Sequence, residues 1–587
     1  MINATLYARD RQYACGDAPT ARTWTSGADL VASFRMAREG NVDSPVRFGE
    51  SAAASWCIAG QIFSLSQGSP ARETNLVTTF LHDGEKVPEQ YWGTYAIVVY
   101  DRQRDRFLAF CDPCGQFPVY YSTGANGELN LASDAADLRP GGRDVAQPNI
   151  SWLHGYLAYG YGEAGETGWK GISLLPPGTL LTFKGGNLQF SRLWSPAKPT
   201  RPLMHNDPIA VLTTVVRSLL GSVPEAILEL SGGLESTALA VALHRAGLST
   251  RTIAVTHFDP HRASSNEISV ARSVANHCKL RYKTFPLLAQ LPFAPVSIIP
   301  FVARPSTQLC FLAQSSGLAN AGLARADGIL VNGHGGDALF LAPPAFGVAL
   351  DAAASFRLLR ATAIVRDLAV MYRVPIWTVI ERSMHATTQY FRGALGQHAS
   401  LDVVRAYPLP PPHGLYDDVL ARGRLRLRPG RRYQIAALGA TLDETVVQVR
   451  PTAHRPILPF LSQPIVELAL RTPLEDLFTG YHNRLTVRHS AFATSKLPNL
   501  WRTDKGDTTH SALQGLRVHY DHVRETCLDG FCVTKSLVHR QALESLIKRA
   551  ALGFPNGLRE ITRIYATEIF LQGAGHRSKL SARVDLT

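Results

Sequence analysis

The stretch Ser231-Gly232-Gly233-Leu234-Glu235-Ser236 decides how the second half of this chain folds. It follows a short apolar run, Ala226-Ile227-Leu228, and it precedes the helical pattern of residues 237–243, which Gly247 ends as a helix C-cap does. A strand, a Ser/Gly-rich turn and a helix form a cradle for an anion, because glycine lets the backbone approach an oxyanion and the helix N-terminus supplies N–H donors. The turn therefore predicts a phosphate site; the alternative is a glycine-rich turn that binds nothing.

The spacing of this turn does not fit the kinase-type phosphate loop, which needs Lys followed by Ser or Thr after its last glycine. It resembles the SGGxDS loop of ATP pyrophosphatases, which release AMP and pyrophosphate. The resemblance implies that Ser231, Gly232, Gly233 and Ser236 hold the phosphates of ATP, with Glu235 beside them.

A second glycine-rich turn follows another short apolar run. Ile329-Leu330-Val331 leads into Asn332-Gly333-His334-Gly335-Gly336-Asp337. In a parallel sheet both turns lie at the same edge, so we expect Glu235 and Asp337 to meet there. Two carboxylates beside ATP phosphates suit Mg²⁺, which takes few protein ligands and completes its octahedron with phosphate and water oxygens. The alternative is that Asp337 only caps the next helix.

Length and composition indicate a globular, multidomain protein. The chain has 587 residues, 45% of them hydrophobic and 18% charged. We find no apolar run that could span a bilayer and no secretory signal at the N-terminus, so we expect a cytoplasmic protein without a membrane partner. The net charge of +13 favours anionic partners, but no zinc finger, RNA-binding aromatic motif or basic arm supports nucleic-acid binding.

Cysteines and arginines each form one local pattern. The eight cysteines are too sparse for a disulfide scaffold. Cys111 and Cys114 have the CxxC spacing of a redox or zinc site, but a second pair with zinc spacing is missing, so we expect free thiols. Arginines alternate with leucines over residues 422–428 and recur at Arg431 and Arg432. This alternation indicates a strand with one basic face, which we interpret as a solvated edge strand.

The spacing of apolar runs divides the chain into two domains. Residues 1–195 contain short, closely spaced strands, which indicate antiparallel sheets. A polar, Pro-bearing linker follows Trp194, and residues 203–587 then alternate strands with helices, which predicts a doubly wound parallel sheet. From about residue 350 the pattern is mostly helical and predicts a helical extension.

Motifs along most of the chain resemble those of the asparagine synthetase family. The N-terminal motifs are Gly60-Gln61-Ile62-Phe63, Trp92-Gly93-Thr94-Tyr95-Ala96, Asp101, Asp112 to Tyr121, Ala132-Ser133-Asp134, Gly171-Ile172, Pro176-Pro177-Gly178 and Trp194. The C-terminal motifs are Ser231 to Ser236, Gly333 to Asp337, Arg455 to Leu461 and Lys505-Gly506. The resemblance implies a mixed α/β and α+β chain: a glutaminase-like antiparallel β-sandwich flanked by helices, followed by an ATP-pyrophosphatase (synthetase) domain.

One departure from the family concerns the source of nitrogen. The family's glutaminase uses a Cys directly after the initiator Met, and this chain carries Ile2 there. The N-terminal domain therefore has the glutaminase shape without its nucleophile, and we expect the substrate itself to supply the amine.

Two relatives share that loss: the β-lactam and carbapenam synthetases, and the cyclases that close the macrolactam ring of lasso peptides. At the position of His334 the asparagine synthetases resemble one another in carrying Glu, and the β-lactam synthetases in carrying Tyr. The His-containing turn, and Lys505-Gly506-Asp507 after Arg502, are more similar to the lasso-peptide cyclases. A glutamine-independent amide ligase and a non-catalytic peptide-binding scaffold remain alternatives; the scaffold is suggested by Glu235, where the family usually has Asp.

The resemblance implies a two-step reaction on ATP and Mg²⁺. An Asp or Glu side chain of a core peptide attacks the α-phosphate, and the peptide's N-terminal amine then displaces AMP from the acyl-adenylate. Gly335 and Gly336 are expected in the nucleotide site, and Glu235 and Asp337 on the metal. Lys505 is the candidate for oxyanion stabilisation, and His334 for accepting the amine proton or for support. A precursor peptide, a leader peptidase and a leader-recognition protein are the implied partners.

Overall fold

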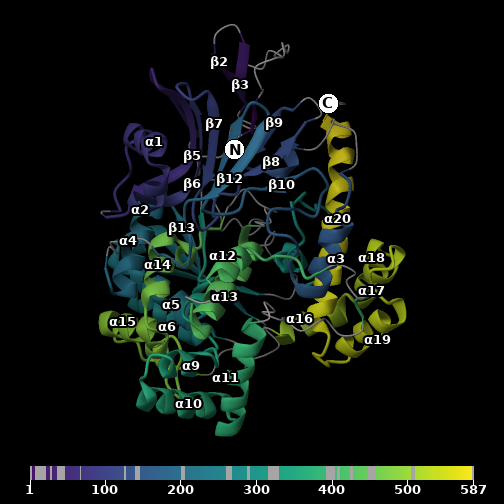
Figure 1. Cartoon of the computed structure of the whole chain (residues 1–587). Helices are drawn as coiled ribbons and strands as arrows, with labels where there is room; N and C mark the ends of the chain where they lie inside the picture. The colour runs from purple at the N-terminus through teal and green to yellow at the C-terminus, as the bar shows by residue number, and fades with distance from the viewer. Residues whose placement is uncertain are drawn as a thin grey trace.

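The computed structural model describes residues 3–6, 21–26, 29–35, 46–66, 68–124, 127–138, 146–199, 205–258, 267–286, 291–314, 329–391, 403–405, 410–423, 427–446, 456–503 and 509–584. Figure 1 shows the N-terminal strands gathered at one end of the molecule and helices filling the other end. A smaller sheet lies between them. The long helix α20 (Leu558–Val584) runs along one side toward the strand-rich end.

The N-terminal strands form two six-stranded sheets in which every paired neighbour is antiparallel. The first has the order β10-β8-β9-β1-β3-β2, with β10 Ser173–Leu174, β8 Tyr120–Thr123, β9 Leu129–Ala132, β1 Asn3–Leu6, β3 Asp29–Arg35 and β2 Ala21–Ser26. The second has the order β12-β11-β7-β6-β5-β4, with β12 Asn187–Arg192, β11 Thr179–Lys184, β7 Arg106–Cys111, β6 Tyr91–Asp101, β5 Ala54–Ser64 and β4 Val46–Glu50.

The second sheet is buried on both faces. Along β6, Ala96, Val98 and Tyr100 pack toward the first sheet, where they join Leu129 and Leu131 of β9. The alternate residues Tyr95, Ile97 and Val99 pack against helix α1 (Glu73–His82) through Leu76, Val77 and Phe80. Because successive side chains of a strand point to opposite faces, this pattern makes a sandwich with a helix on its outer side.

The C-terminal half contains a four-stranded parallel sheet with the order β15-β14-β13-β16. Its strands are β13 Ala226–Glu229, β14 Thr252–Phe258, β15 Arg281–Pro286 and β16 Ile329–Val331. Helices α4 (Pro208–Leu220), α5 (Leu234–Arg245) and α6 (Ile268–His277) precede or connect these strands. The predicted fold class is confirmed: antiparallel sheets in the N-terminal part, then a parallel sheet with helices.

The remaining described segments are mostly helical, as the sequence indicated. The helices are α2 Val87–Gln90, α3 Ile150–Tyr159, α8 Gly336–Leu339, α9 Val348–Ala353, α10 Leu358–Tyr372, α11 Ile376–Phe391, α12 Asp417–Arg422, α13 Pro429–Val446, α14 Gln463–Arg471, α15 Leu485–Ser495, α16 Thr509–Val518, α17 Tyr520–Leu528, α18 Phe531–Thr534 and α19 Arg540–Ala551. Among the described helices, none combines the length and the apolar character needed to cross a membrane.

The basic strand predicted near residues 422–432 is not found in the described part of that segment, and its centre, residues 424–426, lies outside the described residues. Arg422 ends helix α12, and Arg431 and Arg432 belong to α13, while Arg424 and Arg426 lie outside the described residues. Arg431 donates to the carbonyl oxygens of Ala469 (3.3 Å) and Thr472 (2.8 Å) at the end of α14, where a helix leaves carbonyls without backbone donors. These contacts join Arg431 to a distant helix, which a local sequence pattern does not reveal.

A buried interface joins the strand-rich part to the parallel-sheet part. Trp194 donates its indole N–H to Glu467 Oε1 at 3.0 Å, and Gln463 Nε2 donates to the same oxygen at 2.9 Å and to Pro88 O at 2.6 Å. Trp194 and Trp92 share one hydrophobic core with the residues around the parallel sheet. The Glu467 side chain is therefore a buried carboxylate that depends on donors from both parts.

Trp194→Phe is expected to lower the free energy of unfolding by about 1–3 kcal/mol, because the buried Glu467 carboxylate loses a donor. Thermal or urea denaturation followed by circular dichroism measures the change. The matched control is Trp377→Phe, because the Trp377 side chain is 76% exposed, and we expect a change within about 0.5 kcal/mol there. Equal effects of the two substitutions would contradict the interface assignment.

Candidate active site

The first glycine-rich turn connects β13 to α5 and is held by its own serines. Ser231 Oγ accepts from Gly233 N at 3.3 Å and lies 3.2 Å from Ser236 Oγ, which also accepts from Ser231 N at 3.3 Å. Gly232 has φ +73°, and a Cβ there would lie 2.9 Å from Val270 Cγ1. Only glycine therefore suits this position, and the turn keeps the compact shape needed at the start of α5.

The second turn lies directly against the first. Strand β16 pairs with β13 in parallel, with Val331 opposite Leu228, so both turns leave the sheet at its carboxyl edge. A Cβ on Gly333 would lie 2.7 Å from Glu235 Cβ, and one on Gly336 would lie 2.6 Å from Glu235 Cγ. The glycines of the second turn thus make room for the side chain of Glu235, which explains why the two turns occur together.

Glu235 and Asp337 converge, as their positions in the sequence predicted. The Glu235 side chain is 11% exposed and that of Asp337 is 53% exposed. Arg484 Nη1 contacts Glu235 Oε1 and Asp337 Oδ1 at once. Because one cationic nitrogen reaches both carboxylates, the pair is close enough to share a divalent cation.

The donor set fits Mg²⁺ better than a metal that needs a protein cage. Throughout the part of the chain that the structure describes, no three His, Cys, Asp or Glu side chains gather as a metal centre. A cation between Glu235 and Asp337 would therefore take its other ligands from phosphate and water, which is how Mg²⁺ binds in nucleotide sites.

Sequence reasoning missed the two arginines beside these carboxylates. Arg484 has φ 55° and stands just before α15. Arg488 donates its Nε–H to Asn483 O at 2.8 Å and contacts Leu500 O through Nη1. Burial, reinforced by the Arg484 charge, lowers the pKa of Arg488 to about 10. Arg488 fixes the segment that carries Arg484, and no motif around these arginines marks them in the sequence.

Of the two candidate catalytic residues, the structure describes His334 but not Lys505. His334 is exposed on the second turn, and its backbone N–H donates to Asn332 Oδ1 at 3.1 Å. Lys505, with Gly506 and Asp507, lies outside the described residues. The segment that leads to Lys505 contacts the first turn, since Asn499 Nδ2 donates to Thr237 Oγ1 at 3.1 Å and to Gly232 O at 3.4 Å.

The three N-terminal cysteines that the structure describes are not placed for nucleophilic chemistry. Ile2 and Cys15 lie outside the described residues, and Cys57, Cys111 and Cys114 are buried, free thiols. Burial raises the pKa of Cys57 to about 12 and raises those of Cys111 and Cys114 above the ordinary value. None of these three thiols is therefore available as a thiolate near neutral pH.

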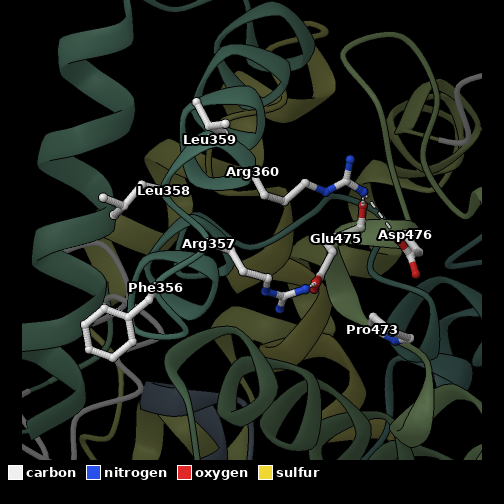
Figure 2. Close-up of a pocket in the computed structure, with 8 residues that line it drawn as sticks. All are labelled: Phe356, Arg357, Leu358, Leu359, Arg360, Pro473, Glu475 and Asp476. Atoms are coloured by element: carbon white, nitrogen blue, oxygen red, sulfur yellow. Dashed lines mark hydrogen bonds and ion pairs between the residues drawn. The ribbon is translucent and has the colours of Figure 1, made fainter.

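A large open pocket lies away from both turns. It has a volume of about 610 Å³ and is lined at the start of α10 by Phe356, Leu358, Leu359 and their neighbours (Figure 2). Arg357 pairs with Glu475, and Arg360 pairs with Asp476 at 3.3 Å. No residue predicted for the active site lines this pocket.

Comparison with known proteins matches two families and finds a curated relative among the ligases. The glutamine amidotransferase domain family matches residues 71–194, and the asparagine synthase family matches residues 210–572. The carboxyethyl-arginine beta-lactam-synthase of Streptomyces clavuligerus is 28% identical over 215 residues, and the match covers 34% of this chain and 38% of that protein. The chain thus spans well under two thirds of that relative's length.

Two solved structures align over much of the chain but with low scores. The allosteric regulatory enzyme of purine biosynthesis gives a TM-score of 0.19 at 10% identity, covering 50% of this chain and 76% of that chain. The glutamine phosphoribosylpyrophosphate amidotransferase of B. subtilis gives a TM-score of 0.20 at 9% identity, covering 59% and 82%. The match over residues 210–572, around two glycine turns that bring Glu235 and Asp337 together, shows that the chain belongs to the asparagine synthase family.

Proposed function

We propose that this protein is an ATP-dependent carbon–nitrogen ligase that activates a carboxylate as its adenylate and joins it to an amine. The observation that carries the proposal is the contact of Arg484 with both Glu235 and Asp337, at the edge where two glycine-rich turns meet. Such an edge provides backbone donors and carboxylates for the phosphates and metal of ATP. Membership of the asparagine synthase family supports ATP-dependent formation of a carbon–nitrogen bond.

We propose further that the substrate is a lasso-peptide precursor and that the product is a macrolactam. Ile2 replaces the nucleophile of the family's glutaminase, so an amine within the substrate is the simplest nitrogen source. His334 in the second turn supports a cyclase rather than an asparagine synthetase. The partners proposed with this role are the precursor peptide, a leader peptidase and a leader-recognition protein, all in the cytoplasm.

The proposed chemistry has two displacements. A side-chain carboxylate oxygen of the peptide attacks the α-phosphorus of ATP, and the bond from that phosphorus to the pyrophosphate oxygen breaks. The N-terminal amine then attacks the acyl carbon, loses a proton and expels AMP.

Each group of the site has a proposed part in these steps. Ser231, Gly232, Gly233 and Ser236 hold the phosphates together with Gly335 and Gly336, and His334 accepts the amine proton or supports the turn. Lys505 stabilises the oxyanion. When bound by Glu235 and Asp337, Mg²⁺ supplies charge neutralisation for the departing pyrophosphate. Holding amine and acyl carbon together is the remaining contribution of the protein.

A ligase of the β-lactam type is the second candidate, because a curated relative is a beta-lactam-synthase. Such an enzyme would close a ring in a small amino-acid derivative by the same two displacements. The two candidates therefore differ in the size of the substrate and agree in the consumption of ATP.

The test uses purified protein, ATP, Mg²⁺ and a synthetic peptide taken from a short open reading frame beside this gene. A peptide with a free N-terminal amine and an internal acid is expected to lose the mass of one water, with AMP and pyrophosphate formed in equal amounts. The matched controls are the N-acetylated peptide and the peptide with Asn or Gln in place of its acid. If a small β-amino acid is cyclised and the peptide is not, the β-lactam candidate is correct.

The purified protein is expected not to release glutamate from glutamine, because Ile2 stands where the family's nucleophilic Cys belongs and the described N-terminal thiols are buried and protonated. A coupled glutamate assay across the purification measures this. Ile2→Cys is an informative comparison, since it restores the residue type at that position. Glutamate release that follows the wild-type protein through each column would contradict the prediction.

A further inference from the structure

Two helices at the end of the molecule opposite the strands carry many exposed apolar side chains. Helices α10 and α11 pack against each other and are joined by residues 373–375, so they form a helical hairpin (Figure 1). Among the described residues, 17 large apolar side chains are exposed, and eight of them lie between residues 356 and 384. Soluble monomers rarely expose apolar patches of more than a few hundred Å², so this clustering marks an interaction surface. We define the hairpin surface by six of these side chains: Phe356, Leu358, Leu359, Trp377, Ile380 and Met384.

Helix α11 is apolar on a face that the rest of the chain does not cover. Val379 and Ser383 are buried on its inner face, where Ser383 Oγ donates to Phe346 O at 2.9 Å. Trp377, Ile380 and Met384 follow one another at spacings of three and four residues, which places them together on another face, and there they are exposed. A helix that carries apolar side chains on several faces is typically covered on all of them. The outer face of α11 therefore calls for a covering partner.

The start of α10 also directs apolar side chains outward. Phe356 is 93% exposed and Leu359 is 89% exposed. Phe356 has φ +58°, a conformation that is rare for a bulky residue and that clusters at functional sites. Figure 2 shows the Phe356 ring directed away from Arg357, which turns toward Glu475. The exposed ring of Phe356 is thus a feature of the folded chain that the ligase site does not explain.

Charges of both signs stand beside these apolar side chains. They include the ion pairs Arg357–Glu475 and Arg360–Asp476 near the start of α10 and, on α11, Glu381 with its neighbours Arg382 and His385. A surface with both signs is complementary to itself, because a two-fold rotation can set the basic groups of one copy against the acidic groups of the other. An anionic membrane would instead be matched by an excess of basic side chains.

The hairpin surface has hollows as well as projections. The open pocket of about 610 Å³ lies beside Phe356 and Leu359, and a second open pocket, of about 410 Å³, is lined by Trp377, Ile380 and Met384. At their exposed fractions, Phe356 and Trp377 offer roughly 250–400 Å² of side-chain surface. Each partner of a standard interface buries about 800 Å². With the other exposed apolar side chains of the hairpin added, the surface reaches the size that a stable dimer needs.

We propose that the hairpin surface is the interface of a homodimer with two-fold symmetry, in which α10 and α11 of one copy pack against the same helices of a second copy. The second copy brings the same apolar projections, the same hollows and the same mixed charges. It covers the outer face of α11 and the exposed ring of Phe356. The proposal goes beyond the ligase activity and does not depend on the identity of the substrate.

The test measures the mass of the purified full-length chain by sedimentation equilibrium over a series of concentrations. The wild type is expected to have twice the chain mass of 64.0 kDa and to dissociate on dilution. Trp377→Glu and Leu359→Glu each place a charge in the apolar interface. Each is expected to raise the dissociation constant of the dimer by about 30-fold or more, the size of an interface hot spot.

Leu552→Glu is the matched control, because Leu552 is an exposed leucine at the end of α19, away from the hairpin (Figure 1). It should keep the dissociation constant of the wild type. All three substituted side chains are exposed, so the unfolding temperature measured by circular dichroism should change little. If one hairpin variant fails to fold, the other decides the result.

The inference is overturned if the wild type is a monomer at about 100 µM, which is above the dissociation constants of standard interfaces. It is also overturned if both hairpin variants dimerise as tightly as the wild type, because the dimer would then use another face. A monomeric wild type that binds vesicles of phosphatidylglycerol, and loses this binding in Trp377→Glu, would assign the surface to a membrane instead. The measurement involves no ATP or peptide, so it stands or falls separately from the proposed ligase activity.

Discussion

Asp337→Asn is expected to reduce adenylation by about 10³-fold or more, because a neutral amide is a poor Mg²⁺ ligand and several kcal/mol of charge stabilisation are lost with the metal. Asp337 is 53% exposed, so the substitution disturbs no packed core and the unfolding temperature should change little. Pyrophosphate release in the presence of the substrate carboxylate measures the first step by itself.

Glu235→Asp is the matched control for this result. The shorter side chain keeps the charge and restores the residue usual in the family, and Arg484 can still reach it from its position beside Asp337. We expect activity close to that of the wild type. Raising the Mg²⁺ concentration should rescue a weakened Glu235 variant in part but not Asp337→Asn. Full activity of Asp337→Asn at ordinary Mg²⁺ concentration would show that Asp337 is only a helix-capping residue.

Lys505→Ala is expected to lower the rate of bond formation by about 10²–10³-fold, the usual loss when one oxyanion donor is removed. Lys505→Arg should also be slow, because a planar guanidinium does not replace a compact ammonium. Single-turnover cyclisation of a peptide with a free N-terminal amine and an internal acid measures the step directly.

The control for Lys505 is Lys496→Ala in the same stretch of chain. Lys496 is exposed at the end of α15 opposite to Arg484, with its ammonium 5.5 Å from the centre of the Phe492 ring. Its removal should leave the rate unchanged. If Lys505→Ala and Lys496→Ala both cyclise the peptide at the wild-type rate, Lys505 has no catalytic part.

The two turns could be predicted because each depends on the backbone conformation of a few neighbouring residues. A buried strand of a parallel sheet reads as a short apolar run, and the glycines that follow it are required by a positive φ at Gly232 and by close approach to Glu235 at Gly333 and Gly336. Strand β16 has the predicted bounds Ile329–Val331, and Gly247 ends helix α5 with φ +78°. Parallel pairing of β13 and β16 then follows from fold rules, and it brings Glu235 and Asp337 together.

The arginine-rich segment shows what a local pattern leaves out. Alternation of Arg and Leu over residues 422–428 favoured a strand, but α12 ends at Arg422 and α13 begins at Pro429. Arg431 is held by carbonyl oxygens at the end of α14, far away in the sequence. A short alternating pattern in the sequence does not reveal such partners, because their positions depend on how the helices pack.

The sequence by itself determined the order of elements, the two glycine turns and the pair of acids, since each depends on backbone conformation within a few residues. Only the tertiary structure decided which charges surround that pair. Arg484 reaches Glu235 and Asp337 from its position just before helix α15, and elsewhere Trp194 joins Glu467 across a buried interface. These contacts join residues far apart in the chain, and burial, which sets their strength, exists only once the chain is folded.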